Sequence, residues 1–317
     1  MSVNARVLLV GREDDLVGPL ADGLDRLGWR TITARGPYAA TTALSDLNVE
    51  AVVVDTTQID EPAALAQRLK TAVHPRRLPV VAIGDPAKAA VEAFDLTLIA
   101  PLHPAQAATR LESLVRAAIA EEELELRQAT FAEHGKRLTS PSGVHGRMRI
   151  LAVGEPAPKF LGLSHALAAA GAEVVGAFTA YTAFDYLHER SFDAVVLWAG
   201  DNQQEALSIA AGMRRNTRLY HVPTLMCLGH ENTISLAEAY HRGVSDIAPP
   251  ETPDAESAAR VLELARAYRR QHAVRQTLES TRTSGLMDVG TGLFTRDLFA
   301  AHLGRLAKAA QARARPL

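Results

Sequence analysis

The feature that most constrains this chain is an internal repeat. The segment Arg6–Gly11 recurs as Arg149–Gly154, and Ala51–Val54 recurs as Ala194–Leu197, both at the same offset of 149 − 6 = 143 residues. Gly28 with Gly171 and Tyr38 with Tyr181 keep that offset. Several matches in the same order over a whole domain length indicate a duplicated fold. A length of 317 residues also accommodates two domains of roughly 150 residues each.

Each copy alternates short runs of β-branched residues with longer amphipathic stretches. The expected strands are Arg6–Val10, Arg30–Thr33, Ala51–Asp55, Pro79–Ile83 and Leu96–Ile99 in copy one, and Arg149–Val153, Glu173–Ala177, Ala194–Trp198, Thr224–Leu228 and Ser245–Ala248 in copy two. Runs that are apolar throughout are typical of strands buried on both faces of a parallel sheet. Five strands alternating with helices therefore predict an α/β fold with two tandem, doubly wound, five-stranded parallel sheets.

Helical stretches lie between and after the strands. Leu16, Leu20, Leu24 and Leu27 share one face of an expected helix, and Gly28 follows where a helix would end. Longer helices are expected over residues 104–138 and 255–278, and a turn-rich cluster at 139–143 marks the boundary between the two copies. The acidic residues 121–123 in the first of these are expected to face solvent at the helix end.

Composition excludes several classes of protein. The formal net charge of −2 argues against a protein that chiefly binds nucleic acid or an anionic membrane, since both usually require a basic excess. No apolar run approaches the roughly 18 residues that a membrane span needs. The single cysteine, Cys227, excludes an internal disulfide and is expected to be an inert buried thiol. We therefore expect a cytoplasmic protein that neither inserts into a membrane nor binds nucleic acid.

A third segment follows the second copy and carries a family motif. Residues 288–299 compare with the pattern D-x-L-T-G-L-x-N-R-R-x-F that opens a GGDEF domain. The matching residues are Asp288, Thr291, Gly292, Leu293, Arg296 and Phe299, whereas Gly290, Thr295 and Asp297 depart from the pattern. The chain thus resembles response regulators of cyclic di-GMP signalling that combine two receiver domains with a GGDEF domain. Within that family it resembles the PleD and PopA types, and the PopA type more closely.

The resemblance implies a domain organisation. Both sheets would be flavodoxin-like, receiver-like folds, with domain one over residues 1–120 and domain two, with a long final helix, over residues 147–278. Residues 121–146 would form a helical extension and linker. Residues 279–317 would form a linker and the first helix of a truncated GGDEF domain, whose remainder would lie beyond Leu317.

The resemblance also assigns roles at the receiver positions of copy one. A working receiver transfers a phosphoryl group to an Asp at the end of its third strand, with Mg²⁺ neutralising charge on the phosphoryl oxygens. Asp55 occupies this phosphoacceptor-like position. The metal-binding acidic pair falls on Gly11 and Arg12, the hydroxyl position on Gly84 and the lysine position on Ala100.

Three interpretations of Asp55 remain open. Glu13 or Asp14 is a weak candidate for a displaced metal ligand that permits slow phosphorylation. Arg12 could instead pair with Asp55 and mimic a neutralised state. A strand-end Asp that accepts local turn hydrogen bonds is the third. Since four supporting groups are replaced, the sequence predicts no catalytic residue and no metal site of ordinary composition.

Copy two departs further from receiver chemistry. Trp198 stands at the acceptor position, and an indole cannot accept a phosphoryl group. The other positions hold Gly154 and Glu155 for the acidic pair, Leu228 for the hydroxyl and Pro249 for the lysine. Asp201 is expected to be only a loop residue, and Trp198 to plug the acidic pocket. Copy two is therefore predicted to be a pseudo-receiver retained for its surfaces.

Function is implied by the resemblance. The PopA type implies a non-catalytic adaptor that dimerises and recruits proteins, including protease-delivery factors, at a cell pole during cell-cycle control. Cyclic di-GMP would bind the missing C-terminal domain, and no cofactor is expected in this chain. The alternative is the phosphorylation-activated regulatory half of a diguanylate cyclase whose catalytic domain lies beyond Leu317. The contact face of copy one is expected near Val91, Phe94, Leu98, Leu111 and Leu114, with the alternative that several of these residues belong to the core.

Overall fold

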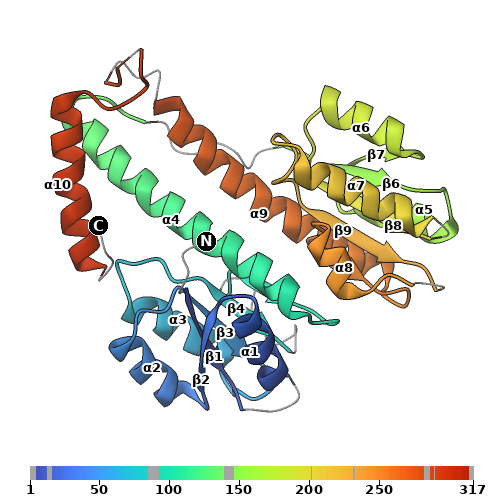
Figure 1. Cartoon of the computed structure of the whole chain (residues 1–317), viewed down its shortest axis with the longest axis horizontal. Coiled ribbons are helices and arrows are strands. Elements are labelled where there is room, and N and C mark those ends of the chain that lie inside the picture. The colour runs from blue at the N-terminus through green and yellow to red at the C-terminus, as the bar shows by residue number, and fades with distance from the viewer. Residues whose placement is uncertain are drawn as a thin grey trace. The chain divides into compact units, whose positions relative to one another are not determined.

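A computed structural model describes most of the chain (Figure 1). The described residues are 5–12, 16–84, 93–138, 146–200, 202–230, 233–281, 286–288 and 290–313. The chain divides into two compact units, one made of Met1–Ser140 with Val274–Leu317 and the other of Pro141–Ala273. Each unit is described separately below.

Unit one contains a five-stranded parallel sheet. Its strands are β1 (Arg6–Val10), β2 (Arg30–Ala34), β3 (Ala51–Asp55), β4 (Val80–Ile83) and β5 (Leu96–Leu98), and its helices are α1 (Val17–Arg26), α2 (Pro37–Asp46), α3 (Pro62–Ala72), α4 (Pro104–Glu133) and α10 (Arg296–Ala312). The strand order is β2-β1-β3-β4-β5, the doubly wound flavodoxin-like order. In that order the topological switch point, where ligands bind in such folds, lies between β1 and β3.

Unit two repeats this architecture. Its strands are β6 (Arg149–Val153), β7 (Glu173–Ala177), β8 (Ala194–Ala199), β9 (Thr224–Leu228) and β10 (Asp246–Ala248), and its helices are α5 (Pro158–Ala169), α6 (Ala180–Glu189), α7 (Gln203–Arg215) and α8 (Leu236–His241). Helix α9 (Asp254–Ser280) begins in unit two, and its residues from Val274 onward are assigned to unit one. The sheet order is β10-β9-β8-β6-β7, the same as in unit one. Even the register repeats, because Val7 pairs with Ala51 and Ile150 with Ala194. The predicted pair of flavodoxin-like receiver folds is thus confirmed, and each expected strand is present to within one residue at either end.

The core of unit one lies on both faces of its sheet, as the apolar strands predict. Leu8 and Val10 belong to one buried cluster and Val7 and Leu9 to another, because successive side chains of a strand point to opposite faces. Burial on both faces explains why these strands show no polar alternation.

The expected leucine face of α1 is mostly correct. Leu20 and Leu24 are buried, but Leu27 follows the last helical residue and is 49 % exposed. Gly28 has φ +93° and donates its N–H to the Asp25 carbonyl at 3.0 Å. The N–H of Trp29 then reaches back to the Leu24 carbonyl at 3.1 Å, so the chain leaves the helix by a glycine C-cap.

Helix α4 packs against α1 of unit one and also against α10 in the C-terminal segment of that unit. Phe131 near the end of α4 is fully buried against Met287 and Leu298, and Leu298 belongs to α10. The expectation that acidic residues 121–123 face solvent is wrong for Glu122, which is only 4 % exposed. Its Oε1 accepts the backbone N–H of Arg77 at 2.7 Å, so the buried carboxylate is hydrogen-bonded.

The GGDEF-like motif forms a tight turn before α10. The Asp288 carboxylate accepts hydrogen bonds from the backbone N–H of Thr291 at 2.8 Å and from its hydroxyl at 2.6 Å. These hydrogen bonds hold the pKa of Asp288 below its ordinary value. Gly292 has φ +66°, and Met287 and Phe294 form an antiparallel bridge across the turn. The Asp, Thr and Gly of the motif therefore have local structural roles.

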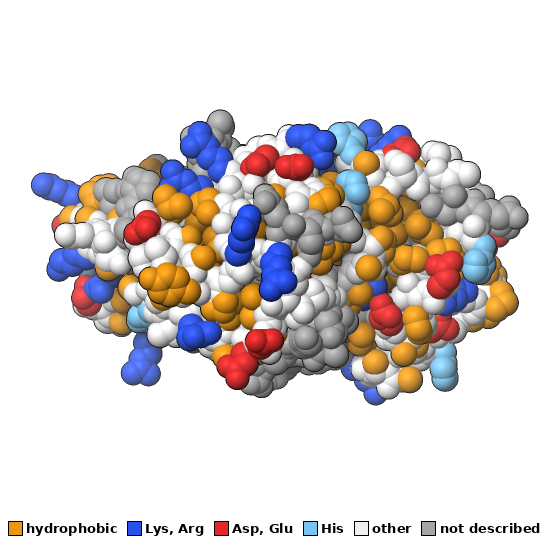
Figure 2. Space-filling model, turned by 90° about the horizontal axis from the view of Figure 1, so that it is seen from below, with side chains coloured by type: hydrophobic (Ala, Val, Ile, Leu, Met, Phe, Trp, Pro, Cys, Tyr) orange, Lys and Arg blue, Asp and Glu red, His pale blue; other side chains and the backbone are white. Residues whose placement is uncertain are grey.

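Surface charge agrees with the near-neutral composition. On the face drawn in Figure 2, basic and acidic side chains are interspersed with exposed apolar ones. No helix among the described residues has both the length and the apolar character that crossing a membrane requires.

Candidate functional site

Asp55 lies at the carboxyl end of β3, at the switch point of the first sheet. It is only 1 % exposed. Its Oδ1 accepts the backbone N–H of Thr57 at 2.8 Å and the Thr57 hydroxyl at 2.7 Å. Its Oδ2 is buried and has no hydrogen-bond partner in the part of the chain that the structure describes. One carboxylate oxygen therefore makes the local turn contacts of the third interpretation, while the other makes no hydrogen bond to any described residue.

Two glycines close on this carboxylate from neighbouring strands. A Cβ placed on Gly11, after β1, would lie 3.0 Å from the Asp55 Cβ. A Cβ on Gly84, after β4, would lie 3.0 Å from Asp55 Oδ1 and 2.7 Å from Thr57 Cγ2. Gly84 also has φ +94°, a conformation that side-chain-bearing residues rarely adopt. Gly84 stands at the expected hydroxyl position and Gly11 at one acidic position. Both thus lie close to Asp55, and neither has a side chain that could bind it.

The remaining receiver positions of unit one supply little to Asp55. Arg12 is exposed, and its backbone N–H donates to Gln58 Oε1 at 2.9 Å. The Arg12–Asp55 ion pair is wrong, because Oδ1 is held by Thr57 and Oδ2 has no partner among the described residues. Ala100 is exposed after β5 and carries only a methyl group. Glu13 and Asp14 lie outside the described residues.

In unit two, Trp198 takes the place that Asp55 has in unit one. A Cβ on Gly154, which has φ +142°, would lie 2.6 Å from the Trp198 Cβ. A Cβ on Gly200 would lie 2.6 Å from the Trp198 Nε1. Contacts this short do not occur between real side chains, so the Cβ and backbone of residue 198 require glycine at 154, and the indole requires glycine at 200. Among the other receiver positions, Glu155 is exposed, Leu228 is buried and Pro249 is half-buried.

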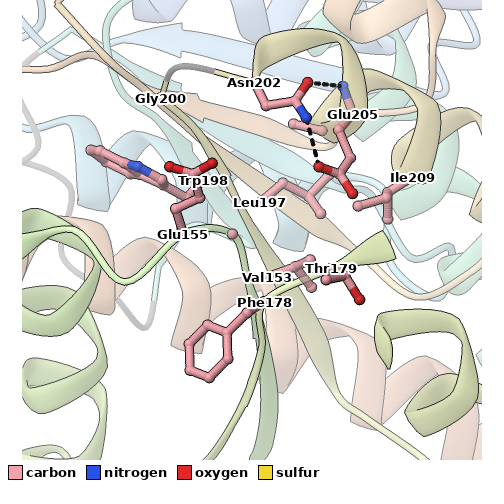
Figure 3. Close-up of a pocket in the computed structure, with 12 residues that line it drawn as sticks. Val153, Glu155, Phe178, Thr179, Leu197, Trp198, Gly200, Asn202, Glu205 and Ile209 are labelled. Atoms are coloured by element: carbon pink, nitrogen blue, oxygen red, sulfur yellow. Dashed lines mark hydrogen bonds between the residues drawn. The ribbon is translucent and has the colours of Figure 1, made fainter. Parts of the chain in front are cut away.

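Trp198 fills the space between these two glycines, and it also forms one wall of an open pocket at the switch point of the second sheet (Figure 3). The lining residues are Val153, Gly154, Glu155, Phe178, Thr179, Leu197, Trp198, Gly200, Asn202, Glu205, Ala206 and Ile209. Trp198, Glu155 and Phe178 lie along one side and Asn202 with Glu205 along another. Asp201 lies outside the described residues.

The sequence analysis missed Asn202 and Glu205. Asn202 caps α7, since its Oδ1 accepts the Glu205 N–H at 3.2 Å while its Nδ2 donates to Glu205 Oε2 at 2.8 Å. The other carboxylate oxygen, Oε1, accepts the N–H of Ala180 at the start of α6, at 2.9 Å. The spacing Asn-x-x-Glu before an apolar helical stretch is a capping-box pattern that could have indicated this pair.

Two further expectations concern buried side chains. Cys227 lies in β9, and burial raises the pKa of its thiol to about 12, so the thiol is protonated and unreactive as expected. Of the residues expected at a contact face in copy one, Phe94, Leu98 and Leu111 are buried in the core. For these three the core alternative therefore holds, while Leu114 is half-buried and Val91 lies outside the described residues. No cluster of three or more metal-ligating side chains occurs within the described ranges.

Comparison with known proteins gives fold-level likeness only. No family model matches the chain, and no curated protein matches it. Among solved structures, a response regulator from Thermotoga maritima shares 17 % identity over 38 % of this chain and 98 % of its own, with a TM-score of 0.34. Chemotaxis response regulator CheY4 of Vibrio cholerae shares 18 % identity over 38 % of this chain and 99 % of its own (TM-score 0.34). A structure described as a probable two-component system response regulator/GGDEF domain protein shares 16 % identity over 83 % of this chain and 99 % of its own (TM-score 0.35).

Proposed function

We propose that this chain is a non-catalytic signalling module in which two degenerate receivers mediate dimerisation and protein recruitment. The observation that supports the proposal most directly is the environment of Asp55. The carboxylate is buried between Gly11 and Gly84 and hydrogen-bonded to its own turn. Phosphoryl transfer depends on several charge-neutralising groups acting together, and the corresponding positions hold glycine, arginine and alanine.

The finer proposal follows the PopA type of the family. By that resemblance, the module would act in cyclic di-GMP-dependent cell-cycle control and regulated proteolysis, in the cytoplasm at a cell pole. By the same resemblance, cyclic di-GMP would be bound by a GGDEF domain. Adaptor or protease-delivery proteins would be the partners, and a homodimer would be the working state.

Incubation with Mg²⁺ and acetyl phosphate, followed by intact-mass measurement, tests the loss of phosphotransfer. We expect the wild-type chain to acquire no more phosphoryl adduct than the Asp55→Asn variant. A stoichiometric adduct on wild type that the variant lacks would overturn the non-catalytic reading of unit one. Sedimentation over a range of protein concentrations tests the proposed dimerisation. A chain that stays monomeric at every concentration would contradict it.

A second candidate is the regulatory half of a diguanylate cyclase. The Oδ2 of Asp55 favours it, because this buried oxygen has no hydrogen-bond partner among the described residues and is the atom that a phosphoryl group or a cation would engage. In this case acetyl phosphate would both modify Asp55 and shift the chain towards dimers. Phosphate-dependent dimerisation that is absent in Asp55→Asn would decide for this candidate.

A further inference from the structure

The open pocket of unit two is not used by any receiver chemistry described above. It lies where β6 and β8 end, and Trp198 stands in place of an acceptor carboxylate. The sheltered space within it is about 50 Å³, well below the range of pockets that enclose a drug-sized molecule, so it can shelter at most the end of a side chain. Its lining mixes polar groups with apolar side chains that include Val153, Leu197 and Ile209. The pocket therefore offers a sheltered surface with a small number of polar groups.

Charge selects the class of ligand. Among the described lining residues, the charged side chains are Glu155 and Glu205, both acidic. The pocket also adjoins the starts of α6 and α7, and helix N-termini ordinarily favour anions. Here Glu205 already supplies the anion, since its carboxylate accepts the Ala180 N–H of α6 and bonds the cap of α7. A second anion would be repelled by these two carboxylates. A cation would be attracted by them, and no described lining residue carries a positive charge that would repel it.

Aromatic side chains favour a particular cation. Trp198 and Phe178 both line the pocket, and ring faces attract guanidinium groups more often than ammonium groups. Guanidinium is planar, stacks on aromatic rings and is weakly hydrated, so it loses little on entering a partly apolar pocket. Glu155 is exposed after β6 and can receive its N–H groups.

The rim of the pocket indicates that the cation belongs to a protein segment. Phe178 is 56 % exposed, and two other large apolar side chains on the same unit, Leu161 and Tyr181, are 55 % and 78 % exposed. Leu161 lies in the first turn of α5 and Tyr181 in the first turn of α6. Both turns follow parallel strands, so they lie at the carboxyl edge of the sheet, as the pocket does. Apolar groups beside a polar pocket are typical of a surface that binds another protein.

We propose that this pocket binds an arginine side chain presented by a partner protein, with apolar neighbours of that arginine covering the rim. The guanidinium group stacks on Trp198 and pairs with Glu155, while Glu205 keeps the helix N-termini neutralised. This inference rests on the proposed recruiting function, and it specifies the chemical group by which a partner protein is bound. It does not depend on Asp55, so its failure is separable from the phosphodonor and sedimentation results.

Titration of the full chain with short peptides tests the inference. The probe is acetyl-Ala-Leu-Arg-Leu-Ala-amide, and its matched control carries citrulline, a neutral isostere of arginine. Binding is followed by the indole N–H signal of Trp198 and the amide signals of Gly154 and Gly200 in nitrogen–proton correlation spectra. We expect saturable shifts with the arginine peptide and at least about fivefold weaker binding of the citrulline peptide.

Variants of the chain complete the test. Glu155→Gln should weaken binding of the arginine peptide about threefold, whereas Glu189→Gln, which changes an exposed glutamate at the end of α6, should leave it unchanged. Absence of saturable shifts, or equal binding of arginine and citrulline, would overturn the inference. Agmatine binding as tightly as the arginine peptide would also overturn it, because the pocket would then serve a free guanidinium compound and not a protein segment.

Discussion

At the scale of single residues, the two copies carry chemically opposite side chains at the same position of the fold. Asp55 keeps a carboxylate but buries it, with one oxygen held by Thr57 and the other without a partner among the described residues. Trp198 replaces the carboxylate with an indole that requires glycine at position 200, while the Cβ and backbone of residue 198 require glycine at position 154. In both units glycine is the residue that makes room, so the lost side chains and the new packing are two aspects of one change.

Restoring a hydroxyl beside Asp55 should therefore be costly. Gly84→Ser adds a Cβ that would lie 2.7 Å from Thr57 Cγ2, at a residue with φ +94°. We expect the free energy of unfolding to fall by about 1–3 kcal/mol. Urea unfolding measures the change. Gly18→Ser is the matched control, because a Cβ there meets nothing within 4 Å, and it should leave stability unchanged or slightly raised. Equal stability of both variants would contradict the strain described at Gly84.

Cys227 gives a second test at this scale. Burial raises the pKa of its thiol to about 12, so almost no thiolate exists near neutral pH. We expect the folded chain to resist iodoacetamide and the urea-unfolded chain to react fully, as measured by intact mass. Rapid alkylation of the folded chain would show that β9 is accessible, against its fully buried pattern.

At the scale of elements, α4 holds the C-terminal segment of unit one through a buried polar cluster. His302 of α10 is 3 % exposed, and its Nε2 lies 3.3 Å from Glu123 Oε1. The same Glu123 oxygen accepts from Arg127 Nε at 2.6 Å, and Arg127 lies 5.3 Å from the Phe294 ring centre. The other ring nitrogen, Nδ1 of His302, lies 3.1 Å from the Thr130 hydroxyl. The motif turn and α10 are thus joined to α4 through charge as well as apolar packing.

This cluster predicts a pH dependence. Burial raises the pKa of the Glu123 carboxyl, but hydrogen bonds and charge from His302 and Arg127 outweigh burial, so the net pKa lies below the ordinary value of 4.5. A depressed carboxyl pKa stabilises the fold above the unfolded-state value, and this stability is lost as pH falls through the folded-state value. Glu123→Gln should therefore lower stability at pH 7 and show a smaller loss than wild type on acidification from pH 5 to pH 3.

Thermal unfolding at a series of pH values measures this dependence. Glu112→Gln on the same helix is the control, because Glu112 pairs only with Arg116 one turn away, at 3.5 Å, among the ion pairs of the described residues. Parallel pH profiles for Glu123→Gln and wild type would show that Glu123 does not carry the effect.

The type and position of the strands could be predicted from sequence, whereas the residues that each helix contacts in the folded chain could not. The strands follow from β-branched runs that occur twice, so each copy supports the interpretation of the other. Glu122 appeared to belong to a solvated acidic run, since nothing near it in sequence shows that Arg77 donates its backbone N–H to it. The unfilled pocket beside Trp198 was missed for the same reason, because it depends on side-chain direction and not on residue type.

At the scale of the whole molecule, unit one is discontinuous in sequence. Residues 274–317 return to the same compact unit as residues 1–140, and residues 141–273 form the other unit between them. Each unit contains one tryptophan, Trp29 in unit one and Trp198 in unit two. Their fluorescence can therefore report the unfolding of each unit when the other tryptophan is replaced by phenylalanine.

Phe131→Ala tests whether the C-terminal segment stabilises unit one. Phe131 is fully buried against Met287 and Leu298, and its truncation should cost unit one about 3–5 kcal/mol. We expect urea unfolding followed by Trp29 to shift to lower denaturant, while unfolding followed by Trp198 stays unchanged. Equal shifts of both signals would show instead that the two units unfold as one.

The discontinuity of unit one also bears on synthesis. A ribosome delivers the chain from its N-terminus, so all of residues 141–273 emerges before α10 does. During that interval the end of α4, including Phe131, lacks the helix that buries it. Translation rate through the intervening stretch thus sets how long an apolar helix end stays open to chaperones.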